Sequence, residues 1–371
     1  MTKEIHQVHF PTTYDAILER ISLIDPIAYG PTRNYLDGAV SYLSPYISRG
    51  VISTNLVYRE LMKRGFHPSS ILKFIQELAW RDYWQQIWIY RGSAINSDLK
   101  NKQAPVSNWS IPSAITNANT GVNAVDIAIE KFYKTGYLHN HLRMYIASIA
   151  CNVAQSHWKV PAQWMYYHLL DADWASNALS WQWVAGANSN KKYYANQDNI
   201  NKFCFTNQKD TFLDIPYEAF ENLEIPETLL NLEILDLKTL LPEQKAINVN
   251  KNIPTCIYNF YNLDPLWNAE ITANRILLLE PSHFEQYPIS KQSLDFVFAL
   301  SKNIKNVQVY IGEFETLKKE FNLNDIRYKE HPLNRHYKGK EDARDWMFAV
   351  KGYFPSFFAY WKKCKKELNY E

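Results

Sequence analysis

Residues 169–187 read LLDADWASNALSWQWVAGA and combine three tryptophans, two aspartates and an asparagine in a segment of helical patterning. Aspartate is a weak helix former, so its repeated use here needs another reason. On a helix, Asp173, Asn177 and Trp181 are spaced by four residues and share one face. A carboxylate, an amide and an indole on one face suit a polar aromatic ligand or a ribose. The alternative is a polar helix start with core tryptophans, and spacing alone favours that plainer interpretation.

Helical patterning extends around this stretch from about residue 12 to residue 205, with almost no strand signal. A polar segment at about 207–241 indicates a linker with a short helix or two. Beyond it the pattern changes to short strands that alternate with helices. Strands are expected at 255–260, 275–281, 306–312 and 325–331, and helices at 290–304, 313–321 and 342–368.

The sequence therefore predicts a mainly α domain at 1–206, a linker at 207–245 and a small α/β domain at 246–371.

Composition excludes several classes of protein. The net charge of the 371 residues is +2, so only a local basic patch could bind nucleic acid. The mean hydropathy is −0.38, and no apolar run approaches the roughly 20 residues of a membrane span. The first ten residues, MTKEIHQVHF, lack a signal-peptide pattern, which favours a cytoplasmic protein. The four cysteines form no C-x-x-C pair, so we expect reduced structural thiols and no metal site.

Aromatic residues make up 15% of the chain, with 12 Trp and 25 Tyr. Large aromatic cores explain part of this content, and flat ligands that stack would explain the rest. Trp80, Trp84 and Trp88 form one helical stripe, with Glu77 and Arg81 beside it. Such a stripe is usually core, although a glutamate beside a tryptophan could also bind the edge of a stacked base.

Two further segments carry candidate ligand-binding residues. In the helical segment after residue 139, Arg143 lies one turn after Asn140 and next to Met144, and it could neutralise a phosphate or an anionic ring. A surface arginine near a helix start is the equally plausible alternative. Ser41 and Ser44 lie in VSYLSPYISRGVIS (residues 40–53), a loop-to-helix junction of the kind that binds phosphates.

Six segments, in this order, resemble the flavin-binding helical domain of the photolyase/cryptochrome family. They are YGPTRN (29–34), VSYLSPYISRGVIS (40–53), QELAWRDYW (76–84), TGVNAVDIAI (120–129), GYLHNHLRMYIAS (136–148) and LLDADWASNALSWQW (169–183). The resemblance covers about residues 12–205, and the spacing between the motifs is close to that of the family.

The resemblance implies that the helical domain binds FAD. The residues that match cofactor-binding positions are Tyr29, Ser41, Leu43, Ser44, Arg81, Asn140, Arg143, Asp171, Asp173 and Asn177. Asn177 matches the position that faces the flavin N5 atom, where an asparagine is typical of photolyases. An amide there tolerates an anionic reduced flavin because it adds no charge.

The resemblance also implies catalytic and substrate-binding residues. Trp181, Trp158 and an outer tryptophan, for which Trp109 is the candidate, resemble the family's electron-transfer chain. The residues that match contacts to a flipped pyrimidine dimer are Glu77, Trp80, Asn140, Met144 and Trp183. These residues imply a deoxyribodipyrimidine photolyase-like lyase that splits cyclobutane dimers in UV-damaged DNA, with no membrane partner.

The chain also departs from the family pattern, which indicates a divergent branch. His141 replaces an arginine that contacts DNA phosphate, and Val40, Tyr42 and Asn123 replace other usual residues. The family's α/β antenna domain normally precedes the helical domain. Here only residues 307–346 loosely resemble its second half, and a plain α/β appendage is equally consistent, so the antenna chromophore is unknown.

Two alternative functions remain open. A cryptochrome-like photoreceptor would bind FAD, use Trp181 and Trp158, and signal to a partner through the C-terminal segment. A flavoprotein without light chemistry would serve as a binding module. Together Glu77, Trp80, Met144 and Trp183 favour repair.

Overall fold

The computed structural model describes residues 8–368, and their contacts divide the chain into two compact units. The first unit is made of Met1–His9, Pro26–Val40 and Ser93–Leu237, and the second of Phe10–Asp25, Ser41–Gly92 and Lys238–Glu371. Each unit combines segments that are distant in the sequence. The sequence predicts continuous domains, one after another along the chain, whereas these units interleave separate segments. The predicted domain boundaries stay a prediction.

The first unit is mainly helical, as expected. Its elements are α2 (Pro26–Thr32), α6 (Ser113–Thr116), α7 (Asn123–Thr135), α8 (Asn140–Ser148), a π-helical turn (Ile149–Val153), α9 (Lys159–His168), α10 (Trp174–Val184) and α11 (Gln197–Cys204), with a two-stranded antiparallel sheet of β1 (Ile111–Pro112) and β2 (Leu232–Glu233). Gly136, with a φ of 65°, ends α7 in the left-handed conformation that glycine favours.

The stretch at residues 169–187 folds as a turn followed by a helix. Asp173 is the N-cap of α10, with extended backbone angles, and its carboxylate accepts a hydrogen bond from the Ser176 backbone N–H at 2.7 Å. The expected helical face therefore holds only for Asn177 and Trp181, which lie inside α10. Aspartate is here because it satisfies a free N–H group at the helix start.

The second unit contains an α/β sheet and eight helices among the described residues. The helices are α1 (Tyr14–Ser22), α3 (Ser44–Ser48), α4 (Thr54–Lys63), α5 (Leu72–Arg91), α12 (Pro281–Gln286), α13 (Lys291–Ser301), α14 (Phe314–Glu320) and α15 (Phe357–Cys364). The strands are β3 (Thr255–Tyr258), β4 (Asn274–Leu279), β5 (Val307–Ile311), β6 (Ile326–Lys329) and β7 (Lys340–Asp342). Short 3-10 helices occur across the chain at Gly92–Asn96, Tyr217–Asn222, Glu227–Leu229, Pro332–Asn334 and Lys365–Glu367.

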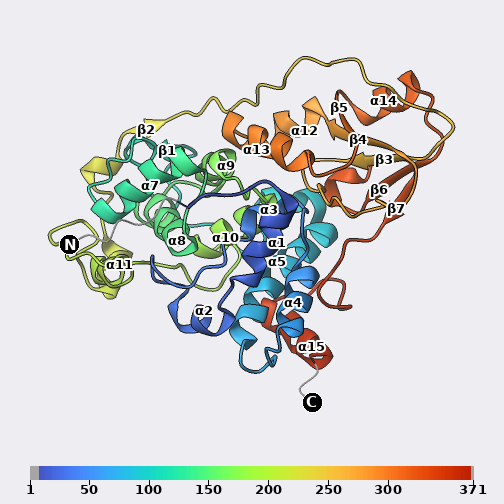
Figure 1. The fold of residues 1–371 in the computed structure, drawn as a ribbon. Helices are drawn as coiled ribbons and strands as arrows, with labels where there is room; N and C mark the ends of the chain where they lie inside the picture. The colour runs from blue at the N-terminus through green and yellow to red at the C-terminus, as the bar shows by residue number, and fades with distance from the viewer. Residues whose placement is uncertain (1–7, 369–371) are drawn as a thin grey trace. The chain divides into compact units, whose positions relative to one another are not determined.

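The sheet is parallel throughout, in the order β5-β4-β3-β6-β7 (Figure 1). Every residue of β3 and β4 is buried, as parallel strands covered on both faces require. Ile257, Ile276 and Leu278 pack in one cluster with Phe314 and Leu317 of α14, so this helix covers one face. The expected strands β3 to β6 and the helices α13 and α14 are confirmed.

Strand β3 lies between β4 and β6. The next strands in the sequence, β4 and β5, extend the sheet on one side of β3, and β6 and β7 extend it on the other. In open parallel sheets, this switch point leaves a crevice beyond the carboxyl ends of the strands where ligands bind. The backbone at Gly50, just after α3, packs closely against the loop after β3. A Cβ at Gly50, whose φ is 62°, would lie 2.4 Å from the Tyr261 carbonyl oxygen, so only glycine fits.

Parts of the C-terminal third differ from the expectation. Of the helical segment expected at 342–368, only Phe357–Cys364 forms an α-helix, because Gly352 adopts a φ of 99° and Pro355 follows. Neither β7 nor α12 was expected. The charged sequence of β7 gives no strand signal, although an edge strand tolerates it.

Candidate flavin site, electron-transfer residues and a second cavity

Arg143 and Asp171 form the main charged pair among the expected cofactor residues of the first unit. The Arg143 Nη2 atom lies 3.0 Å from Asp171 Oδ2, and its Nε donates to the Leu138 carbonyl at 2.8 Å. The Asp171 side chain is 3% exposed and that of Arg143 is 22% exposed. The pair therefore presents a guanidinium whose orientation is fixed by two acceptors, as an anionic ligand group requires.

Asn177 lies on α10 and is almost buried, at 9% exposed. Its amide nitrogen donates to the Ala162 carbonyl of α9 at 2.8 Å, which fixes the rotation of the amide. The carbonyl oxygen of this side chain then remains as an uncharged acceptor for a ligand N–H group. This is the role that the resemblance assigns to the residue beside flavin N5.

Asn140 is the exposed first residue of α8, between two histidines that the structure buries. Burial lowers the pKa of both His139 and His141 to about 4, so both rings are neutral at pH 7. The His141 ring packs edge-on against Phe203 and Tyr145, at centroid distances of 4.6 Å and 4.8 Å. His141 therefore supplies no positive charge for a DNA phosphate, unlike the arginine usual at this position.

The other expected residues of the first unit lie on three helices. Tyr29 is half-buried in α2, Met144 is half-buried in α8, and Trp183 of α10 is 38% exposed with its ring 6.0 Å from that of Tyr193.

In the second unit, the expected phosphate-loop residues lie at the start of α3. Leu43 is the buried N-cap, and Ser41 and Ser44 are half-buried on either side of it. Arg81 of α5 donates from Nη2 to the Ser48 hydroxyl in α3. Arg81 therefore contacts the short helix that begins at Ser44, and its role in binding a phosphate stays a prediction.

Glu77 and Trp80, the residues expected to contact a pyrimidine dimer, both have partners within the second unit. Glu77 pairs with Lys73 one turn earlier at 2.7 Å. The Trp80 ring stacks on Phe357 of α15, with 3.7 Å between centroids and 10° between planes. One face of the indole is therefore covered by the C-terminal helix.

Two of the expected electron-transfer tryptophans are buried and one is exposed. Trp181 is 2% exposed, Trp158 is fully buried, and Trp109 is 64% exposed. Trp109 stacks on His157, with 3.8 Å between centroids, and His157 lies 5.6 Å from Trp158. An imidazole therefore lies next to both rings, which the sequence did not indicate.

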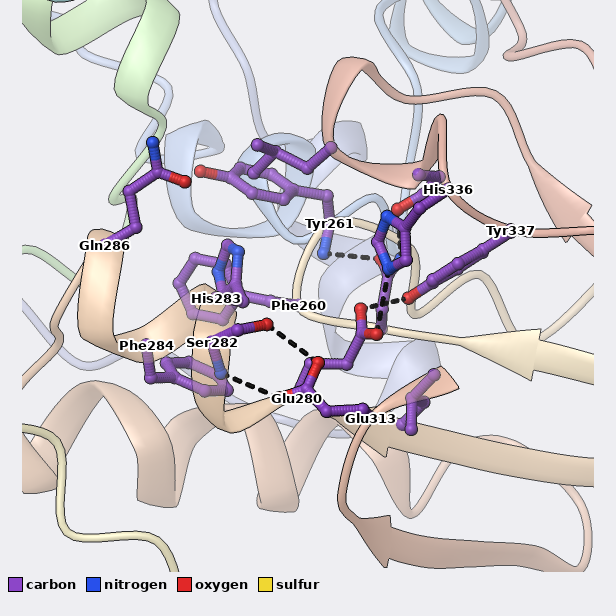
Figure 2. Close-up of a pocket in the computed structure, with 14 residues that line it drawn as sticks. Phe260, Tyr261, Glu280, Ser282, His283, Phe284, Gln286, Glu313, His336 and Tyr337 are labelled. Carbon is purple, nitrogen blue, oxygen red and sulfur yellow. Dashed lines mark hydrogen bonds and ion pairs between the residues drawn. The ribbon is translucent and has the colours of Figure 1, made fainter. Parts of the chain in front are cut away.

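A cavity of about 280 Å³ lies beyond the carboxyl ends of β3, β4, β5 and β6, at the switch point of the sheet (Figure 2). Glu280 organises its polar wall, because it accepts hydrogen bonds from His336 Nε2, the Tyr337 hydroxyl and the Phe314 backbone N–H, each at 2.9 Å. Glu313 accepts from both the backbone N–H and the hydroxyl of Ser282. No sequence motif pointed to this cavity, since its residues come from four separate segments of the chain.

The ionisation of this wall follows from its contacts. Burial opposes the charge of Glu280, but the hydrogen bonds from His336, Phe314 and Tyr337 outweigh it and hold the pKa of Glu280 below its usual value. The same hydrogen bond from its own ring to Glu280 raises the pKa of His336. By contrast, burial lowers the pKa of His283, on the opposite side of the cavity, to about 4.

Within residues 8–368, no three or more His, Cys, Asp or Glu side chains are grouped so as to hold a metal ion. All four cysteines are buried free thiols. No helix among the described residues is long and apolar enough to cross a bilayer.

Residues 74–212 match the family model of the FAD binding domain of DNA photolyase. This part of the chain is therefore a flavin-binding domain of the DNA photolyase type, which confirms the resemblance and FAD as the cofactor.

A Streptomyces griseus protein named deoxyribodipyrimidine photo-lyase is 32% identical over 175 residues, which are 44% of this chain and 37% of that protein. The protein of the same name from Buchnera aphidicola is 26% identical over 266 residues, 68% of this chain and 54% of that protein. A crystal structure of Synechocystis cryptochrome aligns with a TM-score of 0.48 and 25% identity, over 54% of this chain and 45% of that one. The chain thus matches little more than a third of the Streptomyces relative and about half of the Buchnera one.

The donor set of the first unit fits FAD. Arg143 is a fixed cation for an anionic ring or phosphate, Asp171 balances its charge, and Asn177 offers an uncharged acceptor. Asp173 accepts from the Ser176 backbone N–H, and a carboxylate is chemically suited to a ribose hydroxyl.

Proposed function

We propose that this protein is a light-driven DNA repair flavoprotein that splits cyclobutane pyrimidine dimers in UV-damaged DNA. FAD, when bound, supplies the chemistry by passing an electron to the dimer after absorbing blue light. The chain's own residues bind and orient the two partners and exclude water. No side chain needs to act as a nucleophile.

The observation that carries this proposal is the Arg143–Asp171 pair, in which a buried carboxylate orients a guanidinium. Asn177 supports it, because the Ala162 carbonyl fixes the orientation of its nearly buried amide. The positive charge of Arg143 stabilises an anionic ring, and Asn177 accepts a hydrogen bond without adding negative charge. Both features favour the reduced anionic form of the flavin, which electron donation to a dimer requires.

By the resemblance, the residues that would contact the substrate are Glu77 and Trp80 in the second unit, and Met144 and Trp183 in the first. The Glu77 carboxylate hydrogen-bonds the base edges, and the indoles stack on the dimer after it leaves the duplex. A damaged pair is weakly stacked, so its extrusion costs less than that of an intact pair, which supplies part of the selectivity.

The test is blue-light repair of a dimer-containing oligonucleotide by the FAD-loaded chain, followed by analysis of the products. We expect restored thymines, and Glu77→Ala should lower the repair rate by at least about tenfold. Glu60→Ala is the matched control, because Glu60 also pairs with a lysine one helical turn away, in α4. No repair despite bound FAD would contradict the proposal.

One observation favours a second function, that of a blue-light photoreceptor. Phe357 of the C-terminal helix covers a face of Trp80, so this segment contacts a residue of the proposed repair site. In a photoreceptor, light would change the protection of residues 353–368 from hydrogen exchange without any dimer repair. Bound FAD with neither repair nor photoreduction would indicate a binding module instead.

A further inference from the structure

The carboxylate of Asp98 joins two rings of the aromatic path in the first unit. Its Oδ1 atom accepts a hydrogen bond from the Trp158 indole Nε1 at 2.8 Å and lies 3.2 Å from His157 Nε2. Its Oδ2 atom accepts from the Gln103 backbone N–H at 2.8 Å. Asp98 is therefore held from both sides and points at a fully buried indole.

The surroundings fix this geometry on the Trp158 side as well. The buried Gln103 side chain accepts from the Trp158 backbone N–H at 2.9 Å and donates to the Ser156 carbonyl at 2.8 Å. The Lys159 backbone N–H lies 3.4 Å from His157 Nδ1. Since Nδ1 accepts there, Nε2 carries the proton of the neutral ring and donates to Asp98.

Trp109 completes the path at the surface. Its ring stacks on His157, and the backbone of its loop is tied to the same segment, because the His157 N–H donates to the Asn108 carbonyl at 2.8 Å. The two tryptophans are thus linked through an imidazole, and only the inner one bonds to a carboxylate.

We propose that Asp98 accepts the indole proton of Trp158 when Trp158 gives up an electron. This inference rests on the proposed function and on the electron-transfer chain that the resemblance implies, through which the flavin would take that electron by way of Trp181. Loss of one electron turns the indole N–H from a very weak acid into a strong one. A carboxylate at 2.8 Å is within direct proton-transfer distance.

The step balances in charge and atoms. Trp158 loses one electron and its Nε1 proton and becomes a neutral radical, and Asp98 gains the proton and becomes a neutral acid. The pair changes from a charge of −1 to 0, as removal of one electron requires. An electron from a thiol reductant, delivered through Trp109 and His157, restores the indole as Asp98 returns the proton.

The consequence is that the oxidised state is held at Trp158. A positively charged indole in a buried site is costly, and proton transfer to Asp98 removes that charge. Return of the electron to Trp158 must then recover the proton too, which slows charge recombination. Asp98 is a positioning and proton-accepting residue of the electron path, without contact to the substrate.

The test is laser-flash absorption of the FAD-loaded chain in H₂O and D₂O, with Asp98→Asn as the variant. The asparagine oxygen still accepts from Trp158 Nε1 and His157 Nε2 but cannot take the proton, and the amide NH2 group replaces the acceptor of the Gln103 N–H. In the unmodified chain we expect the neutral indole radical, formed with a solvent isotope effect. In Asp98→Asn we expect the cationic radical, no isotope effect, and recombination faster by about tenfold or more.

Two controls make the assignment specific. Trp158→Phe should abolish the neutral-radical signal. Asp126→Asn should leave it unchanged, since Asp126 bonds to the Thr120–Gly121 turn, away from Trp158 in the sequence. A cationic radical in the unmodified chain, or identical signals in Asp98→Asn, would overturn the proposal.

A flavin-free experiment separates this inference from the proposed function. Ultraviolet laser photoionisation removes electrons from indoles directly, and the contribution of Trp158 is the difference from Trp158→Phe. A neutral radical that depends on Asp98 would support the inference even if the chain fails to photoreduce FAD. A cationic Trp158 radical in this experiment would overturn it.

Discussion

At the scale of single residues, Asp82 is a buried acid without a cation in direct contact, and this burial determines its pKa. Its side chain on α5 accepts from the Thr54 hydroxyl at 2.9 Å and from the Met347 backbone N–H at 3.2 Å. Burial outweighs these bonds and raises the pKa of Asp82 to about 6. The folded state therefore binds this proton more tightly than the unfolded state does.

The expected result is a loss of stability as the pH rises from about 4 to about 6, by about 3 kcal/mol at most from this group. Asp82→Asn should remove that contribution, because the amide does not titrate. Urea unfolding at half-unit steps of pH measures it. Asp295→Asn, on the exposed side of α13, serves as control and should keep the wild-type slope. An unchanged slope in Asp82→Asn would contradict the assignment.

The His336–Glu280 pair of the cavity gives a pH dependence of its own. The pKa of His336 is raised in the folded state, so its contribution is complete below about 6.5 and is lost as the pH rises through the folded value. The pKa of Glu280 is lowered, so its contribution is present above about 4.3 and is lost as the pH falls through the folded value.

His336→Gln should therefore reduce stability at pH 5.5 and have a smaller effect at pH 9. Thermal melts at the two pH values test this expectation. Equal effects at both would show that the pair acts through packing alone. The motif analysis found none of these residues, because the pairing of positions 280 and 336 depends on which strands are neighbours.

At the scale of elements, α10 begins at its acidic cap. Asp173→Ala removes the acceptor for the Ser176 N–H and should cost about 1 kcal/mol, whereas Asp173→Asn keeps an acceptor and should cost a few tenths. Chemical denaturation measures both. If Asp173 also binds the FAD ribose, both variants should weaken FAD binding, and only the alanine variant should lose stability. Equal stability of the two variants would exclude the capping role.

Elements with strong local patterns were predictable and those without were not. Helices α5 and α7 carry long amphipathic patterns, and α7 also has a glycine stop, so their residues alone specify them. The segment before α15 is apolar enough to suggest a helix, yet it folds as turns. Its backbone groups find partners at a distance instead, since the Met347 N–H bonds Asp82 and the Gly352 N–H bonds Gln86.

At the scale of the whole molecule, the second unit joins α5 to residues far along the chain. Trp88 is 2% exposed and lies edge-on to Tyr261, Tyr287 and His331. We therefore expect a chain ending at residue 245 to expose this tryptophan and to bind a hydrophobic dye. A chain ending at 368 is the control. Cooperative unfolding and FAD binding by the 1–245 chain would instead support the domain boundaries predicted from sequence.

Buried neutral histidines make the whole molecule sensitive to acid. Burial lowers the pKa of His139, His141, His168 and His283 to about 4, and it holds the pKa of His331 well below its usual value. Each contributes stability above about 6.5 that is lost as the pH falls, by about 3 kcal/mol at most per group near pH 4. Asp82 and His336 act in the opposite direction, but they are outnumbered.

Stability measured by urea unfolding should therefore fall by several kcal/mol between pH 7 and pH 5, a large share of the 5–15 kcal/mol typical of proteins. His168→Phe should reduce this fall, because the ring lies among Phe132, Tyr133 and Trp164. His67→Gln, at an exposed position, should leave it unchanged. A flat profile from pH 7 to pH 5 would show that these rings remain solvated.

The sequence by itself determined the helices and strands that have strong local patterns, and it identified the motif residues of a photolyase-type flavin domain. Periodicity, caps and motif spacing depend on residues that are close in the sequence, so they can be recognised from the sequence alone. Only the tertiary structure decided that Asp98 bonds Trp158, that Phe357 covers Trp80, and that four separate segments line a cavity at the sheet edge. Those contacts join residues tens to hundreds of positions apart, and their partners are chosen by strand order and helix packing, which no local pattern encodes.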